Sequence, residues 1–491
     1  MVSEHMNGPQ IIQGGMGVAV SNWKLARAVA RRNQLGVVSG TAIDAVLVRR
    51  LQNGDPDGDI RHALDEFPFP EMTERILHRY FIPGGKQPEQ PYAPTMMISQ
   101  QPTSEQIELV VIANFVEVLL AKTGHDGLVG INYLEKIQTP TLPSLYGAML
   151  AGVDYVLMGA GIPRWIPGIL DRLSEGQPVT LPLAVVGALA TDNYCLRFSP
   201  HDFTCGEVPW LRRPKFLAIV ASTTLGTMLA AKSDGHVDGF VIEGPTAGGH
   251  NSPPRGGSSF NEQGEPIYGL RDAVDLSVFR KLGRPFWLAG SYGFAEQLPA
   301  AMQQGAAGIQ VGTAFAFCQE SGIEDSIKQR VIALAKRNML SVRTDPVASP
   351  TGFPFKLLQL NGTIADDRAS ESRCRVCDLG YLRQAFRKAD GTVGWRCSGE
   401  PINAYLKKGG EIHETAGRKC LCNGLMATVG LGQQRRRGAE LPMVTCGNEV
   451  NRISQFLKSP AAGSYSADDV LDALLGADAN SRLEPVSSPS L

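Results

Sequence analysis

Over the first 340 residues, short apolar runs alternate with longer segments whose apolar residues recur at helical spacing. The segment "NWKLARAVARR" shows the helical pattern, with Ser21 or Asn22 as its expected N-cap. Continuous apolar runs are typical of parallel strands that are buried on both faces. The runs predicted as strands are "GPQIIQGGMG", "QLGVVSG", "TMMIS", "LVGINY", "DYVLMG", "PLAVVG", "FLAIVAS", "DGFVIEG", "PFWLAG" and "AGIQVG".

This alternation amounts to about eight strand–helix units, which predicts an α/β protein of the TIM (β/α)8 barrel class over residues 1–345. An open, doubly wound sheet is the less favoured arrangement. Residues 55–95 break the rhythm because they are rich in proline, charge and aromatic side chains. We expect an insertion there with one or two helices that cover the barrel mouth.

Beyond residue 345 the alternation fades. Residues 346–475 are predicted to form a cysteine-rich C-terminal extension of mixed helix and loop, with a short last helix in "SADDVLDALLG". Residues 476–491 are expected to be a disordered tail.

Composition and charge narrow the classes of partner. The net charge of −1 gives no electrostatic reason to expect nucleic acid or an anionic membrane surface. No apolar run approaches the roughly 20 residues that span a bilayer, and the N-terminus lacks the pattern of a signal peptide. We therefore expect a cytoplasmic protein that acts on a small molecule. A homodimer is compatible with this sequence.

Glycines follow three of the predicted strands, in "QGGMG", "AGSYGFAE" and "VGTAFAF". Glycine lets the backbone approach a ligand closely, and in barrels the loops after the last two strands commonly hold a phosphate. Any one of these glycines taken alone is better explained by a tight turn. Two such loops in succession, at Gly290–Ser291 and Gly312–Thr313, favour a phosphate site.

A histidine, His250, follows two glycines in "EGPTAGGH", just after the predicted strand "DGFVIEG". Catalytic residues of α/β barrels stand at the carboxyl ends of the strands. Imidazole titrates near neutrality, so it can take a proton from carbon or stabilise an anion. This position favours a catalytic role for His250 over a place in a simple turn.

Together, "IIQGGMG", "GIN", "EGPTAGGH", "AGSYGFAE" and "AAGIQVGTAFAFCQES" resemble the nitronate monooxygenases, also called 2-nitropropane dioxygenases. That family includes FMN-dependent enoyl reductases of the polyunsaturated fatty acid synthase type. The resemblance covers residues 8–330, with the motifs in the family's order.

The resemblance implies a TIM barrel that binds FMN at its mouth, with His250 next to the substrate. The residues that it implies for cofactor binding are Gly14, Gly15 and Met16 along the isoalloxazine, Asn132 near the ring or ribityl chain, Ser222, Gly248 and Gly249 beside the flavin, and Gly290, Ser291, Gly312 and Thr313 at the phosphate.

Two positions depart from the family pattern. Val220 stands where many members carry a basic residue, and Arg255 either reaches an anionic substrate group or is a solvated loop residue.

Three classes of function follow. The first is an FMN-dependent oxidoreductase that oxidises nitronates or similar carbon acids with dioxygen. The second is an NAD(P)H-dependent FMN reductase of an enoyl thioester or a quinone, although no GxGxxG dinucleotide fingerprint is present. The third is a non-catalytic flavoprotein or assembly partner.

Five of the nine cysteines gather in the extension: Cys374, Cys377, Cys397, Cys420 and Cys422. Thiolates at such spacings can hold zinc or an iron–sulfur cluster. The second pair is CxC instead of CxxC, and free cysteines are common buried residues. Buried reduced thiols are therefore the favoured interpretation, and no residue is assigned to a metal.

Overall fold

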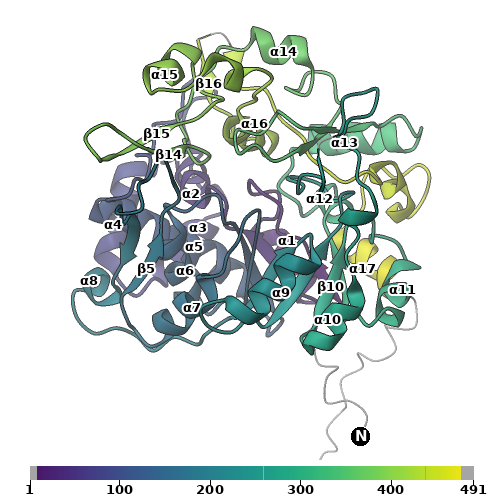
Figure 1. Cartoon of the computed structure of the whole chain (residues 1–491), viewed down its shortest axis with the longest axis horizontal. Helices are drawn as coiled ribbons and strands as arrows, with labels where there is room; N and C mark the ends of the chain where they lie inside the picture. Colours follow the sequence, from purple (N-terminus) through teal and green to yellow (C-terminus); the bar gives the residue numbers. More distant parts are fainter. Residues whose placement is uncertain (1–7, 258, 437, 477–491) are drawn as a thin grey trace, which may run out of the picture.

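Eight parallel strands form a barrel in the computed structural model, which describes residues 8–257, 259–436 and 438–476 (Figure 1). The strands follow one another around the barrel in chain order. The barrel closes between its first two strands, because Leu35 donates its N–H to the carbonyl of Ile11 at 3.0 Å. The predicted TIM barrel is therefore confirmed. Its strands are β1 (Ile11–Gln13), β2 (Gly36–Ser39), β3 (Val129–Leu134), β4 (Tyr155–Gly159), β8 (Lys215–Val220), β9 (Gly239–Glu243), β10 (Phe286–Ala289) and β11 (Gly308–Val311).

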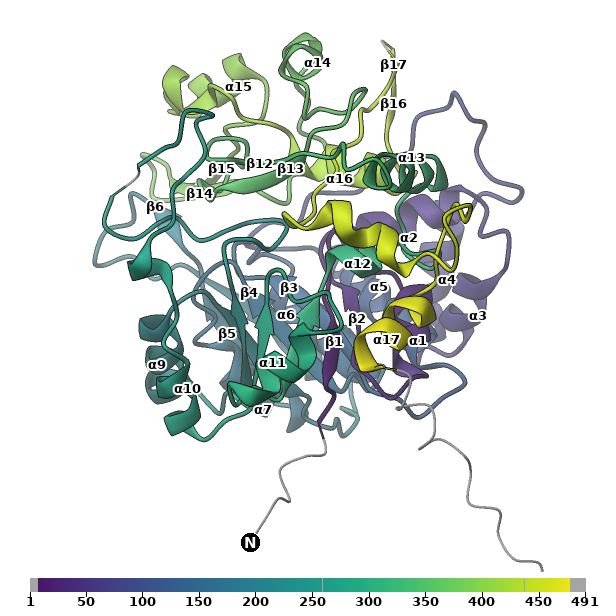
Figure 2. The ribbon, with the colours of Figure 1, turned by 90° about the vertical axis from the view of Figure 1, so that its right-hand side faces the viewer.

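Helices connect successive strands and surround the barrel. Asn22 caps the first of them, since its side chain accepts the N–H of Leu25 at 2.9 Å. The longest has a capping box between Thr103 and Gln106. The surrounding helices are α1 (Trp23–Ala30), α2 (Ile43–Gln52), α5 (Ser104–Lys122), α6 (Thr141–Leu150), α7 (Ile166–Ser174), α9 (Thr223–Lys232), α10 (Leu276–Leu282) and α11 (Gln297–Gln303). The helices α12 (Thr313–Ala316) and α13 (Asp325–Ala335) follow the last barrel strand, and α13 lies near α16 (Leu421–Thr428) above the barrel (Figure 2).

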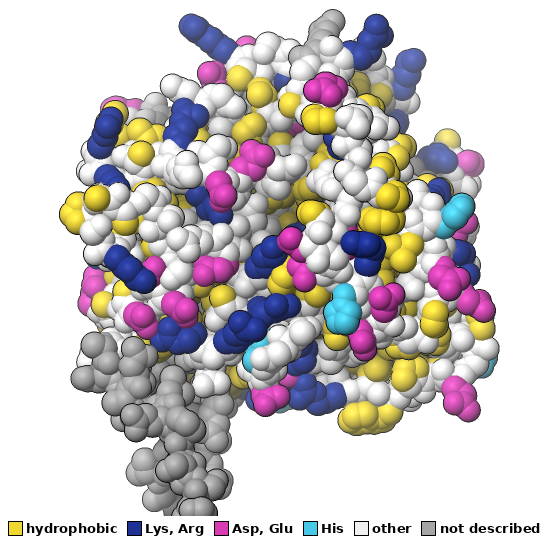
Figure 3. Space-filling model, turned by 180° about the vertical axis from the view of Figure 1, so that it is seen from behind, with side chains coloured by type: hydrophobic (Ala, Val, Ile, Leu, Met, Phe, Trp, Pro, Cys, Tyr) yellow, Lys and Arg dark blue, Asp and Glu magenta, His cyan; other side chains and the backbone are white. Residues whose placement is uncertain are grey.

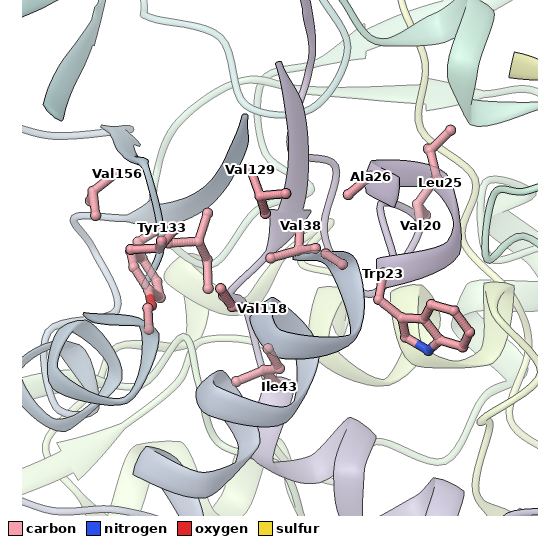
Figure 4. Close-up of a cluster of buried hydrophobic side chains, with 14 of the residues drawn as sticks. Val20, Trp23, Leu25, Ala26, Val38, Ile43, Val118, Val129, Tyr133 and Val156 are labelled. Carbon is pink, nitrogen blue, oxygen red and sulfur yellow. The ribbon is translucent and has the colours of Figure 1, made fainter. Parts of the chain in front are cut away.

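The barrel strands bury both of their faces. Alternate side chains such as Ile12, Val37 and Leu157 fill the barrel interior. Their neighbours along the same strands belong to the outer layer between strands and helices. Figure 4 shows this outer layer where Val38, Val129 and other strand residues meet α1 and α5. Because every strand is covered twice, the sequence shows continuous apolar runs without a polar face.

Two of the predicted strands are not part of the barrel. The "TMMIS" segment, residues 95–99, has no strand structure and lies between prolines; the carbonyl of Ile98 accepts from the guanidinium of Arg383 at 3.0 Å. In "PLAVVG", Pro182 ends β5 (Val179–Pro182), which lies outside the barrel sheet, and β6 (Val185–Val186) pairs with β14 (Gln384–Arg387) of the extension. Periodicity alone cannot tell an apolar strand from an apolar segment that packs under another unit.

The insertion carries α3 (Asp59–Asp65) and α4 (Pro70–Tyr80), as expected, but they do not cover the barrel mouth. They pack on the flank of the barrel against α2 and α5 (Figure 1). An edge-to-face contact between Phe67 and Phe115, with ring centroids 5.0 Å apart, joins the insertion to α5. The prediction of a lid in this segment is wrong.

The C-terminal extension covers the mouth instead (Figure 2). The chain then returns to the flank of the barrel as α17 (Ala467–Leu475), where Arg32 forms ion pairs with Asp468 at 2.9 Å and Asp472 at 2.7 Å. The other elements after α7 are β5 (Val179–Pro182), β7 (Cys195–Phe198), α8 (Pro200–Thr204), β12 (Val342–Asp345), β13 (Phe355–Leu358), α14 (Asp367–Ser372), β15 (Val393–Arg396), α15 (Ile402–Lys407), α16 (Leu421–Thr428), β16 (Gln434–Arg435) and β17 (Gly438–Ala439), with short 3-10 helices at Leu270–Asp272, Ile412–Thr415 and Val450–Phe456. Of the tail predicted to be disordered, residues 477–491 lie outside the described part of the chain.

The surface carries charges of both signs. On the face in Figure 3, Lys and Arg are interspersed with Asp and Glu. This mixture agrees with the net charge of −1. Within the described residues, no helix has both the length and the apolar character needed to cross a membrane.

Close packing of α5 against α6 gives a test of the fold. A Cβ at Gly147 of α6 would stand 2.1 Å from the carbonyl oxygen of Val111 in α5. We expect Gly147→Ala to lower the free energy of unfolding by roughly 1–3 kcal/mol, the usual cost of overpacking. Urea denaturation followed by circular dichroism measures it. Gly206→Ala is the control, because a Cβ there meets no atom within 4 Å; equal stability of both variants would contradict the packing.

Candidate active site

A cavity lies between the carboxyl ends of the barrel strands and the extension that covers them. The ends of β1, β3, β9, β10 and β11 form its floor and walls, and residues of the extension form its roof. Apart from Ser222, all of the site residues predicted from the sequence line this cavity: Gly14, Gly15, Met16, Asn132, Gly248, Gly249, His250, Gly290, Ser291, Gly312 and Thr313.

Ser222 does not line the cavity, and its hydroxyl has a local role. It caps α9 by accepting the N–H of Leu225 at 3.0 Å. Arg255 is also outside the lining; its guanidinium donates to the carbonyl of Ala221 at 2.9 Å. Both side chains therefore make local contacts outside the cavity lining.

The loops after β10 and β11 present hydroxyl groups to one end of the cavity. Gly290 and Ser291 both have positive φ, 93° and 61°, which turns the chain sharply at the end of β10. The buried Oγ of Ser291 has no hydrogen-bond partner. The hydroxyl of Thr313 accepts the N–H of Gly447 at 2.8 Å, so its own hydrogen can be donated to a ligand.

Two amide side chains bring further unpaired acceptors to the cavity. Asn132 donates its Nδ2 to the carbonyl of Gly15 at 3.1 Å, while its buried Oδ1 has no partner. The buried Oε1 of Gln310 is also unpaired. Buried polar atoms without partners are costly, so these atoms fit a cavity that receives a polar ligand.

The two glycines before His250 are explained in part by the extension. A Cβ at Gly248 would stand 2.8 Å from the backbone carbon of Cys446, so the close approach at this position is to another chain segment. Gly249 donates its N–H to Oγ1 of Thr445 at 2.8 Å and has a φ of 81°. Segment 445–449 thus packs against residues 248–250, the "GGH" loop, and forms part of the cavity wall.

His250 is held between the barrel and β13. Its backbone forms an antiparallel bridge with Phe355, and the two rings meet edge to face with centroids 4.8 Å apart. The ring Nε2 is 2.7 Å from the hydroxyl of buried Ser349, which leaves Nδ1 as the nitrogen for a ligand. Desolvation in this setting lowers the pKa of His250 to about 4, so the imidazole is neutral at physiological pH.

A second ionisable side chain of the cavity lining, Glu243, stands at the end of β9, the strand that leads to His250. Its pKa is displaced as well. Burial raises the pKa of this carboxyl to about 7. A carboxyl with this pKa is mostly protonated below pH 7 and mostly ionised above it. It can therefore donate a hydrogen bond or a proton to a bound molecule.

Sequence reasoning missed Glu243, the Ser349 partner of His250 and the whole of segment 445–449. Glu243 had a readable signal, since a carboxylate at the carboxyl end of a barrel strand stands where catalytic groups are found. Ser349 and segment 445–449 had none. Their places depend on how the extension folds back over the barrel.

The carboxyl of Glu243 predicts how stability depends on pH. Its pKa is raised on folding, so its contribution is fully present below pH 4.5 and is lost as the pH rises through about 7. We expect Glu243→Gln to have little effect on the flavin-free protein at pH 4.5, and to stabilise it at pH 8 by up to about 3 kcal/mol. Urea denaturation at both pH values checks this. Exposed Glu262 serves as control through Glu262→Gln, and a pH-independent effect of Glu243→Gln would refute the assignment.

Comparisons with known proteins match part of the chain. Residues 207–347 match the family model of nitronate monooxygenase. A probable nitronate monooxygenase from Staphylococcus haemolyticus is 32% identical over 125 residues, which are 25% of this chain and 33% of that protein. The chain thus spans about one third of the length of this relative.

Solved structures with a similar outline are distant. FabK from Thermotoga maritima has 14% identity and a TM-score of 0.46 over 96% of this chain and 92% of its own. A nitroalkane oxidase from Streptomyces ansochromogenes has 14% identity and a TM-score of 0.47 over 98% of this chain and 99% of its own. The barrel assignment rests on the strand order and not on these likenesses. The resemblance predicted from the motifs is confirmed over residues 207–347, which match the nitronate monooxygenase model and contain β8 to β11 and His250.

Proposed function

We propose that this chain is an FMN-dependent oxidoreductase that oxidises nitronates or similar carbon acids with dioxygen. One observation carries the proposal: in the family-matched region, a neutral histidine next to Gly248–Gly249 lines a cavity at the carboxyl ends of the barrel strands. Chemistry in this class of barrel is built at that end. The homodimer and the cytoplasmic location stay predictions.

Several groups that line the cavity support FMN as its cofactor. Ser291 and Thr313 offer hydroxyl donors to a phosphate, and Gly312 leaves space beside them, since a Cβ there would meet only the side chain of Met16 at 3.6 Å. Asn132 and Gln310 present unpaired oxygens that suit the polar edge of a ring or the hydroxyls of a ribityl chain. When bound, FMN supplies two-electron redox chemistry.

In this proposal, His250 acts on the carbon acid. When its Nε2 carries the hydrogen and donates it to Ser349, Nδ1 has a free lone pair that can take a proton from the substrate carbon. The substrate anion that forms beside the ring raises the low pKa of the imidazolium, because opposite charges stabilise each other. Ser349 is a positioning residue that fixes the ring and its tautomer.

A second function is supported by the charge of the cavity. None of the described residues that line it is Lys or Arg, so nothing there attracts an anion such as a nitronate by a full positive charge. An uncharged acceptor, either an enoyl thioester or a quinone, fits such a lining. The alternative is therefore an NAD(P)H-dependent FMN reductase in which His250 or Glu243 supplies a hydrogen bond or proton to the acceptor.

Anaerobic mixing separates these functions. We expect a nitroalkane or its nitronate to bleach the flavin absorbance and air to restore it. If NADPH bleaches the flavin instead, and an enoyl thioester or quinone restores its absorbance, the reductase function replaces the oxidation of carbon acids. A bound flavin that responds to neither donor would support a non-catalytic flavoprotein.

His250 gives the sharpest catalytic test. We expect His250→Ala to keep FMN, because other strands hold the phosphate, but to slow flavin reduction by a neutral nitroalkane by roughly 10²–10⁴. The preformed nitronate, which needs no proton removal, should lose much less. Stopped-flow absorbance measures both rates. Equal losses on the two forms would contradict proton abstraction by His250.

The phosphate assignment is tested at Gly312. Since a Cβ at this position makes only ordinary contacts, Gly312→Asp and Gly312→Asn should fold alike. The aspartate adds negative charge beside the phosphate, so we expect it to weaken FMN binding at least tenfold more than the isosteric asparagine. Quenching of flavin fluorescence gives both dissociation constants. Similar constants for the two variants would argue against a phosphate at this loop.

A further inference from the structure

Four cysteines of the extension, Cys377, Cys397, Cys420 and Cys422, line one small enclosed pocket. They come from three separate chain segments: the loop before β14, the turn after β15, and the start of α16. All four are free thiols. Cys374, the fifth cysteine of this region, is exposed and does not line the pocket.

The pocket has the surroundings of a buried centre. Its remaining walls are backbone and apolar or small side chains, including Pro350, Gly380, Gly399 and Leu382. The thiols of Cys377 and Cys397 are within hydrogen-bonding reach of each other. Asn423 donates its Nδ2 to Sγ of Cys420 at 3.4 Å, the kind of contact that supports a sulfur ligand.

Positive charge faces these thiols from several sides. The guanidinium of Arg383 interacts electrostatically with Cys377 and Cys397, and that of Arg373 does so with Cys420. Cys420 is the N-cap of α16, where the helix dipole favours a thiolate. The carboxylate of Glu400 also interacts electrostatically with Cys377, but it is paired with Lys408 at 2.6 Å. The local charge therefore suits a centre that carries net negative charge.

We propose that Cys377, Cys397, Cys420 and Cys422 are the four ligands of a thiolate-bound metal centre, either one zinc ion or one iron–sulfur cluster, and that Cys374 is not a ligand. With the side chains as they are placed in the described part of the chain, no group of three or more His, Cys, Asp or Glu could hold a metal ion. Binding therefore involves rotation of these thiols about χ1 toward the pocket between them. Each thiol loses its proton to solvent as it binds, so the centre forms with proton release.

The centre has a structural consequence for the active-site cavity. Leu382, Leu421 and Cys422 line both the thiol pocket and the larger cavity. A metal that joins the three segments fixes the roof of the cavity, in a region whose own hydrophobic cluster is small. Small units with little core commonly depend on such a staple.

Elemental analysis of the full chain, purified without oxygen and without chelators, tests the proposal. We expect about one zinc per chain, or iron with an equal amount of acid-labile sulfide and broad visible absorbance. Either result supports the centre and identifies its metal. Less than about one tenth of a metal equivalent per chain would overturn it.

Cysteine variants test the ligand set. We expect Cys377→Ser, Cys397→Ser, Cys420→Ser and Cys422→Ser each to lose most of the metal, and Cys374→Ser, the matched control from the same CxxC, to keep it. Far-UV circular dichroism and FMN titration report whether each variant folds. If a variant fails to fold, the wild-type protein is used in its place. Its metal is removed with a chelator, and the thiols that become reactive are counted. Four new thiols per zinc ion, or per iron–sulfur cluster, support the set, whereas full metal in Cys397→Ser or loss in Cys374→Ser overturns it.

Discussion

The cavity depends on the contact between the "GGH" loop and segment 445–449. Gly249 donates to Thr445, Gly447 donates to Thr313, and the backbones approach so closely at Gly248 that no side chain fits. These contacts join the loops after β9 and β11 to the extension. The barrel alone would leave its mouth open to water, and the proposed substrate and phosphate sites would lie in separate exposed loops.

Exclusion of water also sets the chemistry. The same burial lowers the pKa of His250 and raises that of Glu243, because it disfavours whichever form is charged. Both groups are therefore uncharged near pH 6, although one is a base and the other an acid. A base and an acid kept neutral in one cavity can move a proton without first separating charge in a dry environment.

The sequence predicted the barrel because its signal is local. Each strand is a short apolar run buried on two faces, and glycines mark the strand ends that line the cavity. "TMMIS" and "PLAVVG" show the limit of that signal, since they are apolar for another reason: they pack against the extension. Ser222 shows a second limit, because a serine at a strand end caps a helix as readily as it meets a ligand.

The extension was less predictable because its role arises from contacts over long sequence distances. His250 meets Ser349 and Phe355, about a hundred residues later, and Gly248 meets Cys446, almost two hundred residues later. No local pattern encodes such pairs. The family-matched region, residues 207–347, ends before all three of these partners, so the groups that close the cavity are contributed by a part of the chain outside that match. Because the proposed substrate site lies under this roof, a change of the proposed specificity is most directly sought in the extension.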